Sequence, residues 1–128
     1  MDEFIRLRLR AFRYAFSGWW YVIRTQRNAW IHAIVSVLTI LVCIVLRLPA
    51  RDWAVIILTI ALVWISEFLN TALEAVVDLA MPIHHPLARV GKDVGAAAVL
   101  ISAITAVLVG IFILGPALWV KIAPVFMR

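Results

Sequence analysis

WISEFLNTALEAVVDLA, residues 64–80, decides the fold, because it places carboxyl groups inside a run that otherwise has the composition of a membrane helix. Three carboxyl groups and an amide interrupt its apolar side chains: Glu67, Asn70, Glu74 and Asp78. One acid near the centre of a membrane helix costs roughly 2.5–3.5 kcal/mol to insert. Carboxyl groups at such a cost indicate a function, or at least a buried partner.

The composition is that of an integral membrane protein. Of 128 residues, 66% are hydrophobic and 15% are charged, whereas soluble domains contain about 45–50% apolar and about 25% charged residues. The formal net charge is +5. Because the basic residues cluster near the ends of apolar runs, we expect them to face anionic lipid headgroups and not nucleic acid.

Three apolar runs are each long enough to cross a membrane, since about 20 helical residues span the hydrocarbon core. We expect an all-α fold whose transmembrane domain, residues 29–128, has three membrane helices, at about residues 29–48, 53–80 and 94–114. A tight turn, Leu48–Asp52, joins the first two helices. Two prolines in the linker Met81–Asp93 argue against one continuous helix through it.

In residues 1–28, aromatic and aliphatic side chains alternate with six arginines. This pattern predicts an amphipathic helix that lies in the membrane interface. The alternative is a basic tail that only sets the orientation. Together with Arg89 and Lys92, this segment places eight basic residues on one side of the membrane, against four on the other. By the positive-inside rule, we expect the N-terminus in the cytoplasm and three crossings.

The polar residues of the second run share one helix face, within roughly 100° of arc at 100° per residue. Residues 53–80 would form about 42 Å of helix, against about 30 Å of hydrocarbon. The run starts on the outer side, so Glu67 would lie about 21 Å along it, in the inner half of the membrane. Glu74 and Asp78 would then lie near or beyond the cytoplasmic boundary.

Three explanations fit a one-sided column of acids. It could bind a metal ion together with a phosphate-bearing substrate, it could conduct protons or cations, or it could join helices through polar contacts. Polar contacts account well for Asn70 and Thr71. They account poorly for the carboxyl groups, because acids are rare in membrane helices.

Lys92 and Asp93 stand at the entry to the third run. A lysine and several acids at a cytoplasmic membrane edge suit magnesium-bound nucleotide phosphates, because the lysine pairs with phosphate and carboxylates bind magnesium. The alternative for Lys92 alone is an ordinary interfacial lysine. The sequence has neither a P-loop nor the glycine-rich signature of soluble kinases. We interpret His84 and His85 as linker residues near the phosphate.

EFLNTALEAVVD (Glu67–Asp78) and HHPLARVGKDVGAAAVL (His84–Leu100) resemble the prokaryotic diacylglycerol kinase family. A third stretch, AFRYAFSGWWYVIRTQRNAWIHA (Ala11–Ala33), resembles the Gram-positive-type branch, which includes undecaprenol kinase. The resemblance extends from about Phe12 to Leu114. Its most specific part is E-x-x-N-[TS]-A-x-E-x-x-x-D in a transmembrane helix, followed by K-D.

The resemblance implies a lipid kinase of the bacterial cytoplasmic membrane that uses ATP and magnesium. It implies a homotrimer whose active sites are shared between neighbouring chains. By motif, Glu67 would be the general base that takes the proton of the lipid hydroxyl, and Glu74 would be a magnesium ligand. Gln26 stands where the family usually has Glu as a second metal ligand. The nucleotide would be bound by Asn70, Glu74, Asp78, Lys92 and Asp93.

The sequence therefore predicts a small membrane kinase that phosphorylates a lipid alcohol. Undecaprenol is favoured over diacylglycerol, because the linker and N-terminal segment resemble the Gram-positive-type branch. Gln26 leaves open a catalytically weak relative that binds lipid or nucleotide, since an amide carbonyl is a weaker magnesium ligand than a carboxylate. The buried acids alone leave open a proton-coupled carrier.

Overall fold

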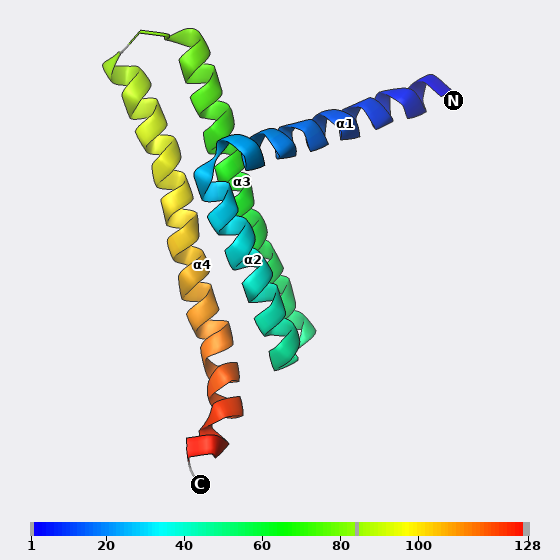
Figure 1. Cartoon of the computed structure of the whole chain (residues 1–128), viewed down its shortest axis with the longest axis vertical. Coiled ribbons are helices and arrows are strands. Elements are labelled where there is room, and N and C mark those ends of the chain that lie inside the picture. The colour runs from blue at the N-terminus through cyan, green and yellow to red at the C-terminus, as the bar shows by residue number, and fades with distance from the viewer. Residues whose placement is uncertain (1, 84, 127–128) are drawn as a thin grey trace.

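The computed structural model describes residues 2–83 and 85–126. In this part of the chain all regular structure is helical, which confirms the predicted fold class (Figure 1). The helices, in order, are α1 (Asp2–Thr25), α2 (Arg27–Leu46), α3 (Ala50–Ala80) and α4 (Pro86–Phe126).

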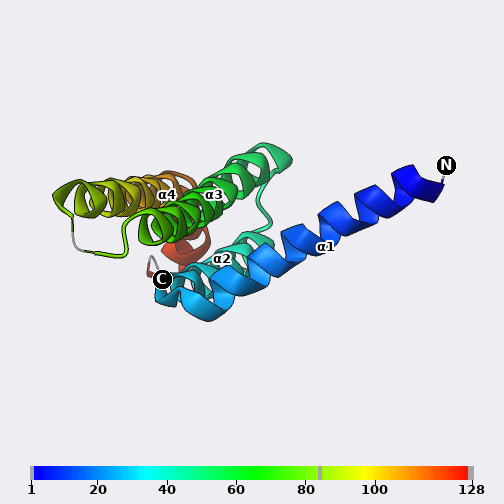
Figure 2. The same ribbon diagram turned by 90° about the horizontal axis from the view of Figure 1, so that it is seen from above.

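Three of these helices are long and apolar enough to cross a membrane. They comprise Arg27–Leu46, Ala50–Ala80 and Pro86–Pro124. α2, α3 and α4 run along the long axis of the molecule, whereas α1 extends away from them in both views (Figures 1 and 2). This arrangement suits three membrane helices with an amphipathic helix lying across one end.

α1 contacts the bundle through its C-terminal half. The Trp19 ring stacks on the Trp64 ring with centroids 5.0 Å apart, and it lies 5.9 Å from the Phe68 ring. Large apolar residues nearer the N-terminus of α1, such as Phe4 and Phe12, are exposed within the single chain. Within the described residues, the apolar side chains in the N-terminal part of α1 are therefore not covered by the chain. Its contact with the membrane interface stays a prediction.

Short breaks separate the first three helices. Gln26 has an extended backbone, with φ −100° and ψ 117°, and lies between α1 and α2. At the other end of α2, Arg47 is left-handed, with φ 55°. Its N–H donates to the Ile44 carbonyl at 3.1 Å, which closes the helix end. The break at Gln26 directs that side chain toward α3, as described below.

Among the described helices, α3 and α4 make the most extensive contact with each other. α3 has 31 residues and α4 has 41, lengths of about 46 and about 60 Å that exceed the hydrocarbon thickness of about 30 Å. The end of α3 and the start of α4 extend beyond the level of α1 (Figure 1). This supports the expected projection of α3 out of the membrane.

α4 differs from the sequence expectation at both ends. It begins at Pro86, inside the segment predicted as a linker, and it continues through Pro116 beyond the predicted end of the third span. Proline is well tolerated in the first turn of a helix, where its missing N–H has no helical partner. Pro86 therefore starts α4, and the connection from α3 is shorter than expected. As the two prolines predicted, no single helix continues through the linker, because α3 ends at Ala80 and α4 begins at Pro86.

Candidate active site

Glu67 is the most deeply buried ionisable residue on α3, with 1% of its surface exposed. Its nearest ionisable partner is His32 of α2, whose Nε2 lies 3.7 Å from Glu67 Oε2. Both of these atoms are buried without a hydrogen-bond partner. Thr71 belongs to the same site but bonds only to the backbone, since its hydroxyl donates to the Glu67 carbonyl at 2.9 Å. The two unpartnered atoms make this pair a candidate for chemistry.

A second cluster forms two turns further along α3, around the Glu74 carboxylate. The Asn70 amide donates to Glu74 Oε1 at 3.1 Å, and the Gln26 amide donates to Glu74 Oε2 at 3.4 Å. Gln26 reaches this carboxylate because it occupies the break between α1 and α2. These side chains, with Asn28 and His32, line a cavity of about 280 Å³, which we call the polar pocket.

Gly95 of α4 closes one side of this cluster. A Cβ at Gly95 would collide with Asn70 Oδ1 and would lie 3.2 Å from Leu73 Cδ2. A larger residue at this position would therefore have to displace the Asn70 side chain, and glycine lets α4 approach α3 at the level of Asn70 without that change. The bond between the Ser66 and Ser102 hydroxyls, at 2.7 Å, joins the same two helices further along.

The polar pocket has oxygen donors suited to magnesium. Glu74 supplies a carboxylate, Gln26 supplies an amide, and Asn70 Oδ1 is buried without a hydrogen-bond partner. Magnesium in nucleotide enzymes commonly uses one or two carboxylates, with waters and substrate phosphates as its other ligands. No group of three His, Cys, Asp or Glu side chains suited to a metal occurs among the described residues. The residues thus fit magnesium held jointly with phosphates, and they do not form a complete protein cage.

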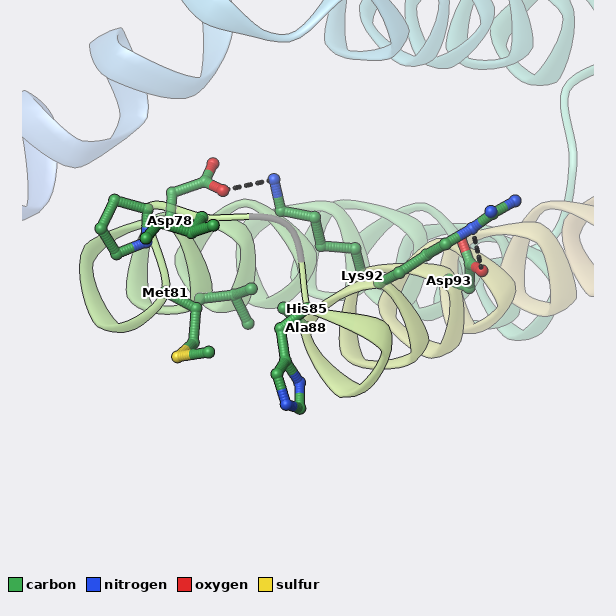
Figure 3. Close-up of a pocket in the computed structure, with 10 residues that line it drawn as sticks. Asp78, Met81, His85, Ala88, Lys92 and Asp93 are labelled. Carbon is green, nitrogen blue, oxygen red and sulfur yellow. Dashed lines mark ion pairs between the residues drawn. The ribbon is translucent and has the colours of Figure 1, made fainter.

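The third group lies on the projecting end of the α3–α4 hairpin (Figure 3). Lys92 Nζ contacts Asp78 Oδ1 at 2.5 Å, and Arg89 Nε lies 3.7 Å from Asp93 Oδ2. These four residues line a cavity of about 640 Å³ together with His85. We call it the hairpin pocket. His84, which we also placed near the phosphate, lies outside the described residues.

An apolar groove of about 330 Å³ runs along the membrane-spanning part of α2, α3 and α4. His32 lines both this groove and the polar pocket. A long hydrocarbon chain in the groove would therefore end beside the histidine that faces Glu67. Representative lining residues of the groove are Ser36, Thr39, Ile60, Ala106 and Leu114.

The structure divides the predicted site residues into three places. Glu67 is buried at the level of the groove, Gln26, Asn70 and Glu74 share the polar pocket, and the rest line the hairpin pocket. A single chain covers the inner part of the polar stripe and leaves its outer part exposed, since 65% of the Asp78 side chain is accessible. Glu67, Asn70 and Thr71 are buried within one chain. The close approach of α4 at Gly95 provides part of that cover.

Sequence reasoning missed His32 as the partner of Glu67. A histidine inside an apolar run was a signal, because ionisable groups in membrane helices usually pair with one another. The partner itself could not be assigned, since 35 positions separate the two residues and their contact depends on how α2 packs on α3.

Comparison with known proteins gives consistent matches. The sequence pattern of the prokaryotic diacylglycerol kinase family matches residues 13–114, a range that contains every predicted site residue. A diacylglycerol kinase of Synechocystis sp. is 49% identical over 111 residues, which are 86% of this chain but only 63% of that protein. An undecaprenol kinase of Bacillus subtilis is 36% identical over 109 residues, 85% of this chain and 89% of that protein. A diacylglycerol kinase of Escherichia coli is 37% identical over 89 residues, 64% of this chain and 73% of that protein.

Proposed function

The chain belongs to the prokaryotic diacylglycerol kinase family, a family of membrane-embedded lipid kinases, and on this basis we propose that it transfers the γ-phosphoryl group of ATP to the hydroxyl of undecaprenol. The observation that carries the proposal is the position of Glu67. Its carboxylate is buried beside His32, which lines both an apolar groove and a polar pocket. A lipid alcohol needs this combination, because its tail is apolar and its reacting group is not.

In the proposed reaction, Glu67 accepts the proton of the lipid hydroxyl. The lipid oxygen then forms a bond to the γ-phosphorus, and the bond from that phosphorus to the bridging oxygen of ADP breaks. General bases typically contribute about 10²–10⁴-fold to a rate. Thr71 and Asn70 are buried on the same face of α3, so they help to fix the helix that presents the base.

The hairpin pocket is the proposed site of the nucleotide. Lys92 and Arg89 supply positive charge for phosphates, and the pocket is large and open enough for a polar ligand. In the present structure Lys92 pairs with Asp78. A bound triphosphate would replace that carboxylate as the lysine partner, and Asp78 and Asp93 would then be free to contact the sugar or base.

The polar pocket lies between the buried base and the hairpin pocket along α3. We propose that Glu74 holds magnesium there, with Gln26 in a supporting position. Magnesium would supply charge neutralisation for the phosphates. The Asn70 amide, which donates to Glu74, keeps that carboxylate oriented.

Undecaprenol and diacylglycerol are both substrates named among the relatives. We favour undecaprenol because the undecaprenol kinase of B. subtilis matches this chain over 89% of its own length. Diacylglycerol is the second candidate, supported by the 49% identity to the Synechocystis diacylglycerol kinase. Transfer of radiolabelled phosphate from ATP to the two lipids, presented side by side in mixed micelles, tests the choice. A higher kcat/KM for diacylglycerol would reverse our preference, and labelling of neither lipid would remove the kinase proposal.

We further propose a homotrimer in the bacterial cytoplasmic membrane, with the N-terminus in the cytoplasm. The trimer is proposed from the family resemblance alone. One chain already buries the inner part of its polar stripe, so neighbouring chains are not needed to cover it. The orientation rests on the distribution of basic residues. Native mass spectrometry in mild detergent should give a trimer. Monomer alone at all protein concentrations would contradict the assembly.

A further inference from the structure

A general base must lose its proton before it can act again, and Glu67 is poorly placed to lose one. Only 1% of its surface is exposed, and its Oε2 is buried without a hydrogen-bond partner. A proton taken from a lipid hydroxyl would therefore stay on Glu67 unless a neighbouring group removed it. The proposed function thus needs a second proton acceptor close to this carboxyl group.

His32 is the one side chain among the described residues that forms an ion-pair contact with Glu67. Glu74 lies on the same helix, two turns away. α4 has no titratable residue between Val94 and Val120, and α1 packs against this part of α3 through Trp19.

The position of His32 connects Glu67 to the polar pocket. The His32 side chain is 14% exposed, against 1% for Glu67, and it lines the pocket that contains Gln26 and Glu74. Its ring also lies edge-on to Trp64, with centroids 6.4 Å apart, and the Trp64 indole donates to Ser36 at 3.3 Å. The histidine is thus held between the buried base and the more accessible cavity.

We propose that His32 is a proton-relay residue, which receives from Glu67 the proton removed from the lipid hydroxyl and releases it through the polar pocket. The inference rests on the proposed role of Glu67. In the relay, the O–H bond of protonated Glu67 breaks and an N–H bond forms at His32 Nε2. This leaves an imidazolium beside a carboxylate, and loss of that proton to solvent restores neutral His32.

The distance of 3.7 Å between Nε2 and Oε2 is longer than a hydrogen bond. Small side-chain rotations bring such a pair into contact, and hydrogen bonds in catalytic sites are often long before substrate binds. Because both atoms lack any other hydrogen-bond partner, no existing bond opposes this closure.

The test is a rapid-mixing measurement of lipid phosphate formed by His32→Gln, with magnesium, ATP and the better lipid substrate. Glutamine retains a polar side chain but cannot accept the proton at neutral pH. We expect the first turnover of His32→Gln to proceed at a rate close to that of wild type. Its steady-state rate should then be lower by about 10-fold or more, a smaller effect than the usual contribution of a general base. Thr105→Val, an exposed change on α4 whose hydroxyl bonds only its own helix, should match wild type in both phases.

Two results would overturn the relay: a wild-type steady-state rate in His32→Gln, or a first turnover slowed as much as the later ones. If His32→Gln does not fold, His32→Ala provides the second test, since added imidazole should raise its steady-state rate and an equal concentration of a non-basic azole should not. Absence of rescue in a folded His32→Ala would also reject the relay. Failure of the relay can be distinguished from failure of the proposed function. If Glu67 is not the general base, Glu67→Gln would itself retain a wild-type first turnover.

Discussion

The two halves of the acid stripe on α3 lie in contrasting environments. Glu67 is almost completely buried among helices, and among the described residues its ion-pair contact is with a histidine. Asp78, three turns later, has 65% of its side chain exposed and pairs with Lys92 on the projecting hairpin. One sequence motif therefore supplies a desolvated carboxyl group at one end and a solvated one at the other.

The difference in burial indicates that the carboxyl groups at the two ends of the stripe have different roles. A carboxyl group placed inside a membrane helix costs roughly 2.5–3.5 kcal/mol, and a cost of this size is expected where burial serves chemistry. An exposed ion pair contributes only about 0–1 kcal/mol to stability, so Asp78 and Lys92 can exchange partners easily. We therefore propose that the buried half serves proton transfer and the exposed half serves reversible nucleotide binding.

The largest effect should come from the buried half. Glu67→Gln keeps the size and polarity of the side chain but removes the base, so we expect kcat for lipid phosphorylation to fall by about 10²–10⁴-fold. Steady-state assays with radiolabelled ATP measure this directly. Activity within a few-fold of wild type would mean that the buried carboxyl group does not perform the chemistry.

The next largest effect should come from the exposed half. Lys92→Met removes a charged hydrogen-bond donor to phosphate, a contact worth about 1.5–3 kcal/mol, so the KM for ATP should rise by about 10- to 100-fold. Lys121→Met is the matched control, because Lys121 lies toward the opposite end of α4 and donates to the Val45 carbonyl. Equal KM values in the two variants would remove Lys92 from the nucleotide site.

Between the two halves, Gln26 should have a smaller effect. Gln26→Glu adds a second carboxylate beside Glu74, whose Oε2 lies 3.4 Å from the Gln26 amide. Since magnesium prefers carboxylate oxygens, the magnesium concentration for half-maximal activity should fall several-fold, with lipid preference unchanged. A magnesium titration identical to that of wild type would show that Gln26 does not contribute to metal binding.

The smallest effect concerns stability. Asp78→Asn breaks the exposed pair with Lys92, and we expect the free energy of unfolding in detergent to change by less than about 1 kcal/mol. Chemical unfolding followed by circular dichroism gives this value. A loss well above 2 kcal/mol would show that the hairpin depends on this pair, which would contradict its role as a replaceable contact.

The sequence predicted what depends on helical periodicity. Three apolar runs, an amphipathic start and a one-sided acid column were all readable, because each is a pattern within one helix. The separation of the stripe into buried and exposed halves also followed from helix length, since α3 is longer than the hydrocarbon is thick.

Contacts between helices could not be predicted in the same way. The Glu67–His32 pair and the Gln26–Glu74 bond join residues 35 and 48 positions apart, so they depend on the break at Gln26 and on the packing of α2 against α3. The cover of Asn70 depends on Gly95. The sequence alone does not identify Asn70 as the side chain that lies against Gly95.

The most direct test of this division of work is to measure ATP binding and first-turnover lipid phosphorylation on the same preparations of Glu67→Gln and Lys92→Met. We predict that Glu67→Gln binds magnesium-ATP with wild-type affinity but forms almost no lipid phosphate. We predict that Lys92→Met binds magnesium-ATP more weakly and recovers transfer when ATP is raised. The account would be contradicted if Glu67→Gln lost ATP affinity to the same extent as Lys92→Met, or if it formed lipid phosphate at the wild-type rate.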